Sequence, residues 1–153
     1  MSTLSISNLD SLRAAVGREI GISDWHVVDQ CMINAFAALT GDRQWIHVDP
    51  ERARQELPQG RTLAHGFLTL SLMSQLHAQA VHIGGVRRVI NYGLNRVRFP
   101  APVLAGARIR SRSVLVAIEE MADSVQLTWK ITIEVEGQAK PALVAEWLLR
   151  YFG

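Results

Sequence analysis

Residues 62–80, with the sequence TLAHGFLTLSLMSQLHAQA, decide the fold of this chain. Large apolar residues are spread around most of a helical wheel here: Phe67, Leu68, Leu70, Leu72, Met73 and Leu76. A helix that is apolar on nearly every side is normally buried in a protein core. The apolar part is short and is interrupted by hydroxyl and amide side chains, so it does not suit a bilayer-spanning helix. The stretch therefore predicts a central helix that the rest of the chain covers.

The composition is that of a soluble protein, which we expect to form one domain over residues 1–153. Hydrophobic residues make up 48% and charged residues 20% of the chain, and the formal net charge of +2 gives no argument for nucleic acid as a partner. The lone Cys31 excludes an internal disulfide and fits a reducing compartment. The first residues lack the basic start and apolar run of a signal peptide. We expect a cytoplasmic protein that binds neither nucleic acid nor membrane.

Three short helices are expected before the central one, each opened by an aspartate that can accept hydrogen bonds from the first backbone N–H groups. They are expected at residues 11–16 after Asp10, from Asp29 to Gly41, and from Asp49-Pro50 to Pro58. Between the second and third of these helices, residues 42–47 are expected to form a loop.

After the central helix the periodicity changes to that of a strand. Residues 124–136 alternate almost perfectly between apolar and polar side chains, and residues 143–151 repeat the pattern. Other strands are expected at residues 21–28, at residues 86–99, and around Arg108, Arg110 and Arg112, with a bulge near Ser113. One apolar and one polar face on each strand is typical of antiparallel sheets, so the predicted fold class is α+β.

The segment GDRQWIH, residues 41–47, carries the first candidate site, Asp42 and His47. A carboxylate and an imidazole that converge on one water can exchange protons with it, which is general acid–base catalysis. On a continuous helix the two side chains would diverge, but a loop after Gly41 can turn both toward one point. The structural alternative is that Asp42 caps a turn while His47 satisfies a backbone group.

The second candidate site is the start of the central helix, where AHGF occupies residues 64–67. Gly66 has no side chain, so a ligand carbonyl can approach its backbone N–H closely, and the positive end of the helix dipole favours negative charge there. The alternative is that Gly66 only lets the helix pack against a neighbour. From these residues alone, both interpretations stay open.

Together the two segments resemble a known family. GDRQWIHVDPERA, from Gly41, followed by AHGFLTLSL, from Ala64, is similar to the MaoC-like (R)-specific enoyl-CoA hydratases of the hot-dog fold. VINYGLNRVRFPAP, residues 89–102, extends the resemblance to the nodulation-protein-N-like branch. The resemblance covers residues 36–112 and implies a long antiparallel sheet wrapped around the central helix. It also implies a homodimer in which two sheets join edge to edge.

The resemblance implies a role for each matching residue. Asp42 and His47 would be the catalytic pair, Gly66 would donate its backbone N–H to a thioester carbonyl, and Ser74 would be a substrate-binding serine. Whether Ser74 instead only eases helix packing stays open. Many hydratases have Asn-Pro where this chain has Gln44-Trp45. This departure puts any polar contact from position 44 in doubt, although the nodulation-type branch shares Gln-Trp.

The activity implied is reversible syn hydration of a trans-2-enoyl-CoA to an (R)-3-hydroxyacyl-CoA. It implies no cofactor, because coenzyme A is part of the substrate. We expect no metal, since a paired-Cys motif is lacking and His26 has no partner at ligand spacing. One alternative is an acyl-CoA thioesterase, which would need a carboxylate on or near the central helix, whereas residues 67–80 contain no Asp or Glu. Another is a non-catalytic acyl-CoA binding protein.

Three further groups of polar residues could take part in binding or lie at the surface. The arginines Arg87, Arg88, Arg96 and Arg98 could meet the phosphates of coenzyme A, or could lie on a solvated sheet face or dimer rim. Asn91, Tyr92 and Asn95 lie on a strand that could line the substrate channel. His77 and His82 are expected to be partly solvated.

Overall fold

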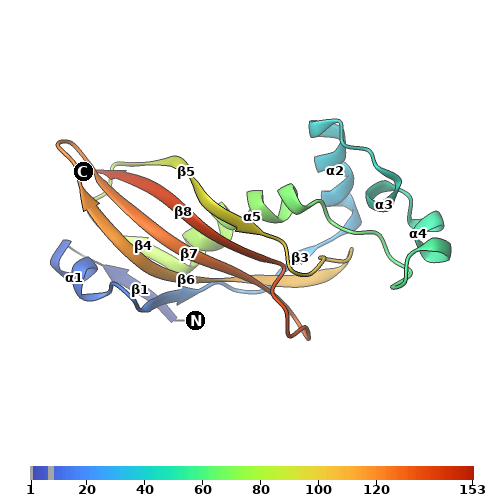
Figure 1. Ribbon diagram of the computed structural model, residues 1–153, viewed down its shortest axis with the longest axis horizontal. Coiled ribbons are helices and arrows are strands. Elements are labelled where there is room, and N and C mark those ends of the chain that lie inside the picture. Colours follow the sequence, from blue (N-terminus) through green and yellow to red (C-terminus); the bar gives the residue numbers. More distant parts are fainter. Residues whose placement is uncertain (1, 7–8) are drawn as a thin grey trace.

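A computed structural model describes residues 2–6 and 9–153 as one long curved sheet with α5 lying along it (Figure 1). The helices are α1 (Leu9–Ala14), α2 (Gln30–Thr40), α3 (Trp45–Val48), α4 (Pro50–Glu56) and α5 (Gly66–Ala80). The strands are β1 (Ser2–Ile6), β2 (Glu19–Ile22), β3 (His26–Val28), β4 (Val81–Ile83), β5 (Arg88–Arg98), β6 (Ala107–Glu120), β7 (Val125–Val135) and β8 (Leu143–Phe152). The predicted α+β class is confirmed.

The strands lie in the order β4-β1-β2-β6-β7-β8-β5, and β3 pairs with β6. All of the pairs are antiparallel except that of β1 with β4, which is parallel. The alternation predicted for β7 and β8 is confirmed, because their apolar residues face the core and Trp129, Ile131 and Leu143 are completely buried. Leu68, Met73 and Leu76 of α5 belong to the same core. None of the described helices is long and apolar enough to cross a membrane.

The sheet covers only one side of α5. Leu76 is fully buried, whereas Phe67 is 70% exposed and Ser71, Ser74 and Ala78 are exposed along the same open side. The expectation that this chain covers its central helix is therefore only half right. A large apolar side chain at the surface beside open helix positions indicates that something else can cover this side.

Two of the three predicted helix caps form. Asp29 accepts a hydrogen bond from the Met32 N–H at 2.8 Å, and Asp49 accepts one from the Arg52 N–H at 3.0 Å. The cap predicted at Asp10 is wrong, because α1 already begins at Leu9. The loop predicted at residues 42–47 contains the start of the one-turn helix α3.

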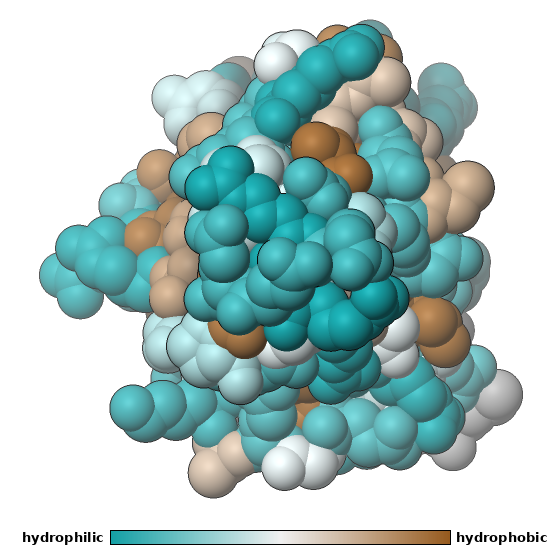
Figure 2. All heavy atoms as spheres, turned by 90° about the vertical axis from the view of Figure 1, so that its right-hand side faces the viewer, coloured by the Kyte–Doolittle hydropathy of each residue, from teal (hydrophilic) through white to brown (hydrophobic). Residues whose placement is uncertain are grey.

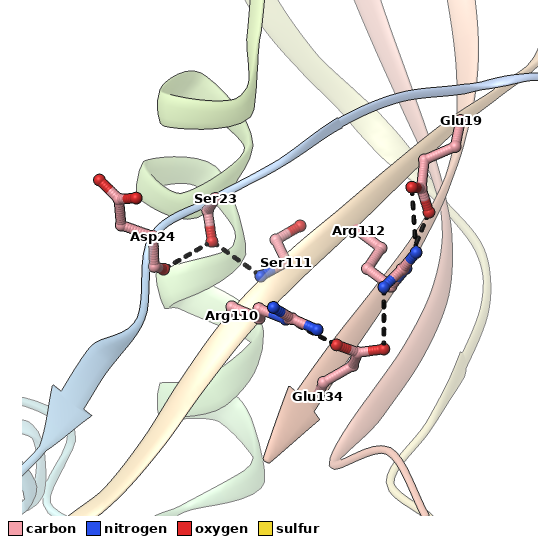
Figure 3. Close-up of polar contacts among 7 residues, drawn as sticks. All are labelled: Glu19, Ser23, Asp24, Arg110, Ser111, Arg112 and Glu134. Atoms are coloured by element: carbon pink, nitrogen blue, oxygen red, sulfur yellow. Dashed lines mark hydrogen bonds and ion pairs between the residues drawn. The ribbon is translucent and has the colours of Figure 1, made fainter. Parts of the chain in front are cut away.

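The strand predicted at residues 21–28 is divided into β2 and β3. Between these two strands, the Ser23 side chain takes the place of a backbone acceptor in the pairing with β6. Ser23 accepts a hydrogen bond from the Ser111 N–H at 2.9 Å and donates one to the Asp24 carbonyl at 2.9 Å (Figure 3). On the outer face of the sheet, Arg112 bridges Glu19 of β2 and Glu134 of β7 (Figure 3). The pairing of β2 with β6 is irregular at the predicted place, because Glu19 pairs with Val114 and Gly21 with Ser113. A second irregularity lies at residues 115–117 in the pairing of β6 with β7. The short strands β1 and β4 were not predicted.

Gly21 allows β2 to cross the end of α5 at backbone distance. A Cβ atom at this position would lie 2.0 Å from the Ala80 carbonyl oxygen, which is far inside van der Waals contact. Both partners are backbone, so neither can move aside without shifting an element. The absence of a side chain at position 21 thus sets how closely α5 and the sheet approach.

His77 is buried, which corrects the expectation that it is partly solvated. It is 6% exposed, and its Nδ1 lies 2.9 Å from the Ser113 Oγ of β6. Burial lowers the pKa of His77 from 6.5 to about 4. The exposed His82 agrees with the expectation.

We expect His77 to make the fold sensitive to acid. Between pH 6.5 and about 4 the unfolded chain takes up a proton that the folded chain refuses, so the free energy of unfolding falls as the pH falls. The full effect is on the order of 3 kcal/mol. Urea titrations across this pH range should show the loss in the wild type and in His82→Gln, but not in His77→Gln. An equal loss in His77→Gln would contradict this origin.

Candidate functional site

Asp42 directly follows the end of α2. Gly41 adopts the left-handed conformation with φ of 80° and donates its N–H to the Ala37 carbonyl, which ends the helix and turns the chain. Asp42 is exposed, and its carboxylate accepts a long hydrogen bond of 3.4 Å from the Gln44 N–H. Most of the hydrogen-bonding capacity of this carboxylate therefore stays available.

His47 lies on α3 and is 8% exposed. Its Nδ1 lies 2.6 Å from the Leu63 carbonyl oxygen. A carbonyl oxygen can only accept, so Nδ1 carries the hydrogen and Nε2 of the neutral ring presents a lone pair. The hydrogen bond thus fixes the tautomer and leaves one nitrogen able to accept a proton.

The structure brings Asp42 and His47 together. A carboxylate oxygen of Asp42 and a ring nitrogen of His47 lie within 4.8 Å of each other. One water with two ordinary hydrogen bonds spans such a gap. Both residues also have the structural roles named as alternatives, because Asp42 accepts a hydrogen bond from the Gln44 N–H and His47 is hydrogen-bonded to the Leu63 carbonyl. These contacts still leave acceptor capacity on the Asp42 carboxylate and one ring nitrogen of His47 without a partner among the described residues.

Gly66 is the first residue of α5, and its N–H makes no hydrogen bond to the described residues. The first N–H groups of a helix have no acceptor within the helix and attract negative charge. Gly66 and His47 line the same cavity of about 270 Å³, together with Thr69, Phe99 and Pro100. A carbonyl oxygen in this cavity could therefore meet the Gly66 N–H while the adjacent carbons face His47.

The residues that hold this arrangement together carry no motif and were not predicted. The Gln30 amide donates to the His47 carbonyl at 2.8 Å and accepts a hydrogen bond from the Thr62 hydroxyl. The Leu63 N–H donates to the Ile46 carbonyl at 2.9 Å. These contacts tie α2, α3 and the entry to α5 into one unit. They join residues 17 to 32 positions apart, and no local pattern in the sequence signals them.

His65 also lies in the site, although no role was predicted for it. Asp42, His47 and His65 each place a potential ligand atom within 4.8 Å of the others, a grouping that could hold a metal ion. Nδ1 of His47 and Nε2 of His65 already face backbone carbonyls, which leaves one nitrogen on each ring. The absence of a metal stays a prediction, and a chelator is expected not to change the activity.

Ser74 lies apart from the other predicted site residues. It is eight residues beyond Gly66, which is about 12 Å along the helix. It lines a second cavity, of about 430 Å³, between the open side of α5 and the strands β5 and β8. His77, Asn91 and Trp147 line the same cavity, and Asn91 accepts a hydrogen bond from the Trp147 Nε1 at 2.8 Å. Within one chain, Ser74 therefore does not contact the Asp42–His47 pair.

The four candidate arginines are exposed on β5 and just before it. The Arg88 guanidinium lies over the Phe152 ring at 4.3 Å, and Arg98 donates to the Val97 carbonyl at 2.8 Å. These positions suit either alternative, a phosphate site or a solvated face. The end of the molecule that carries α2, α3 and α4 presents a mainly hydrophilic surface with isolated hydrophobic residues (Figure 2).

Known proteins share this sequence and fold. The MaoC like domain family matches residues 11–136. The chain is 51% identical to 3-hydroxyacyl-thioester dehydratase Z of Mycobacterium tuberculosis over 148 residues, covering 96% of this chain and 97% of the relative. It is 44% identical to Nodulation protein N of Rhizobium meliloti over 150 residues, covering 97% and 91%.

Solved structures of a hydratase and of a MaoC-like dehydratase have a similar fold. The (R)-hydratase from A. caviae superposes with a TM-score of 0.67 at 26% identity, covering 88% of this chain and 94% of that one. The MaoC-like dehydratase from Rhodospirillum rubrum shares the fold with a TM-score of 0.72 at 23% identity, covering 90% and 92%. The chain therefore belongs to the MaoC-like dehydratase family and has its hot-dog fold.

Proposed function

We propose that the chain catalyses the reversible syn hydration of a trans-2-enoyl-CoA to an (R)-3-hydroxyacyl-CoA. One observation carries this proposal: a carboxylate and a proton-accepting imidazole lie within 4.8 Å of each other beside a helix N-terminus that opens with glycine. Membership in a dehydratase family and the 51% identity to a 3-hydroxyacyl-thioester dehydratase support a lyase reaction on a thioester.

The chemistry needs only the substrate, water and this chain. The Asp42 carboxylate and the Nε2 of His47 hold one water between them and accept a proton from it as its oxygen attacks C3. The pair then returns a proton to C2, so the elements of water add from one face. As the C–O bond forms, negative charge develops on the thioester oxygen, and the Gly66 N–H stabilises it. No cofactor is required, because the thioester itself activates C3.

The acyl chain has a path along the open side of α5. The first cavity, beside Gly66, is followed along the helix by the second, around Ser74, whose lining includes Val81, Val89 and Leu149. An apolar lining with a few polar groups is typical of small-molecule sites. We therefore assign the second cavity to the acyl tail, with Ser74 as a substrate-binding residue.

Incubation of the purified protein with crotonyl-CoA separates this proposal from its alternatives. Loss of the enoyl absorbance without release of free thiol would establish hydration. Release of free thiol would indicate a thioesterase, which the lack of Asp and Glu in residues 67–80 disfavours. Saturable binding without either change would indicate a non-catalytic acyl-CoA binding protein.

We also propose that the protein is a homodimer joined through β5. This strand is one edge of the sheet, and Val89, Ile90, Tyr92 and Leu94 on it are 39–55% exposed. A long exposed apolar edge strand invites pairing with another chain unless it is covered. A second copy would cover β5 and the open side of α5 at once. Sedimentation at micromolar concentration should therefore give twice the chain mass of 17.0 kDa.

Charge substitutions test which surface forms the dimer. Ile90→Glu together with Leu94→Glu should give a 17.0 kDa species, because two like charges would face their copies across the pairing. Val116→Glu is the matched control, since Val116 is similarly exposed, at 42%, but lies on β6. A wild-type protein that sediments as a monomer would refute the dimer, and dissociation by Val116→Glu would place the interface elsewhere.

A further inference from the structure

His65 contacts each part of the proposed site, although the chemistry above does not use it. The residue is 3% exposed and immediately precedes Gly66 at the start of α5. Its side chain extends toward the loop after α2 and toward α3. These contacts bring together three segments that are far apart in the sequence.

The first contact is with the backbone of Asp42. The Nε2 of His65 lies 2.9 Å from the Asp42 carbonyl oxygen. Because a carbonyl only accepts, Nε2 carries the hydrogen and donates it. This hydrogen bond holds the exposed residue Asp42 at its backbone. The carboxylate itself has only the long contact to the Gln44 N–H, so little else restrains its position.

The second contact is with the ring of His47. The two imidazoles stack with their centroids 3.8 Å apart and their planes 25° from parallel. The hydrogen bond to Leu63 holds one edge of the His47 ring at Nδ1. The His65 ring packs on the face of the His47 ring and limits its tilt, so it helps to set the direction in which Nε2 points. Phe36 of α2 packs against His65 in turn, at a centroid distance of 5.0 Å.

The third feature is the position of His65 as the N-cap residue of α5. Its side chain makes no capping hydrogen bond, although Asn, Asp and Ser are the residues that normally cap helices. Its Nδ1 is buried without a hydrogen-bond partner among the described residues. A buried polar atom without a partner costs stability and calls for an explanation. A residue that caps poorly and buries an unpaired nitrogen is therefore poorly explained by stability alone.

We propose that His65 is a positioning residue that fixes the Asp42 carboxylate, the Nε2 of His47 and the Gly66 N–H relative to one another. This role rests on the hydration reaction proposed above. Small displacements of catalytic groups lower the rate strongly, whereas the bound substrate still has its other contacts. The loss of His65 is therefore expected to lower kcat with little change in KM.

Three variants separate the contacts of His65. His65→Asn provides a good capping residue but loses both the stack and the reach to Asp42, so its thermal stability should hold while kcat falls roughly 10- to 100-fold. His65→Gln can keep the hydrogen bond to Asp42, and His65→Phe can keep the stack on His47. Each of these should retain more activity than His65→Asn. His26→Asn is the matched control and should match the wild type, because His26 lies on β3 and lines neither of the two cavities.

A second measurement does not depend on turnover. Long-range ¹H–¹⁵N spectra report which nitrogen of His47 carries the hydrogen and whether the ring holds one orientation. The wild type should show a single Nδ1–H form, which should broaden or become mixed in His65→Asn and His65→Gln. If the wild type does not hydrate crotonyl-CoA, the proposed function fails while these spectra still test the positioning.

The proposal about His65 is overturned if folded His65→Asn shows His47 signals and Gly66 amide shifts identical to the wild type. It is equally overturned if His65→Asn and His65→Phe both keep the full kcat. If His65→Asn does not fold, the spectra of His65→Phe and His65→Gln decide the question, because both substitutions keep most of the buried volume.

Discussion

Alanine at Asp42 or at His47 is expected to lower kcat by at least about a thousandfold, within the range for loss of acid–base catalysis. Both side chains act on one water in the proposed reaction, so removing either disables the same step. The double variant should therefore be little worse than the poorer single variant, because residues that work as a unit are not additive. Substrate binding should weaken far less, since the thioester would still meet the Gly66 N–H. Steady-state kinetics with crotonyl-CoA measure these changes.

Structural damage must be separated from lost chemistry in these variants. Asp42→Asn removes the charge but can still accept the hydrogen bond from the Gln44 N–H, so it should be as inactive as Asp42→Ala while the loop is kept. Asp49→Asn is a matched control, because Asp49 caps α4 and lies outside the reacting pair. If the two losses multiply, the residues serve separate steps. Near-normal hydration by a folded single variant would refute the mechanism.

Gly66→Val is expected to lower kcat/KM by roughly a hundredfold or more, the scale for losing an oxyanion donor. A Cβ atom at this position points into the cavity and lies 3.4 Å from the Phe99 ring, and the two methyl groups of valine extend further. They would occupy the space through which a thioester oxygen reaches the N–H. The fold should survive, since Phe99 is 43% exposed and can move. Thermal unfolding should therefore change little.

Two further variants identify the cause of the Gly66→Val effect. Gly66→Ala should show a smaller loss than Gly66→Val, because it adds only the Cβ. Combining Gly66→Val with Phe99→Ala relieves the contact with the ring but leaves the N–H obstructed. Recovery of activity in that double variant would mean that displacement of Phe99 was the fault. Full activity in Gly66→Val would mean that the carbonyl is bound elsewhere.

The features that could be predicted from the sequence depend on local interactions. The caps at Asp29 and Asp49 involve an acceptor and an N–H three residues apart, and the alternation along β7 follows from the strand period alone. The pairing of β1 with β4 joins residues 4–6 to residues 81–83, and both strands are too short to show a periodicity. The burial of His77 was missed for a similar reason, because its partner Ser113 lies on β6.

The residues of the candidate site also fall into those that local motifs predicted and those that only tertiary contacts bring in. Asp42, His47 and Gly66 were found as short motifs, and the structure brings them to one place. Their supports were not found, because Gln30 reaches His47 and Thr62, and His65 reaches Asp42, only after α2, α3 and α5 have come together. The resemblance implied that Ser74 binds substrate, and α5 carries this residue into a second cavity, apart from the Asp42–His47 pair.

The hydrogen bond between Leu63 and Ile46 closes the chain around residues 49–61, which leave the site and return beside their starting point. Within this segment α4 lies beside α3 at one end of the molecule (Figure 1). It buries only Ala53 and forms its own ion pairs, Arg52 with Glu56 and Arg54 with Glu51. Loops whose ends are held tolerate changes of length at low entropic cost. Evolution could therefore lengthen, shorten or exchange this segment while Asp42, His47 and Gly66 keep their relative positions. Substrate range could then diversify at the rim of the site without new chemistry.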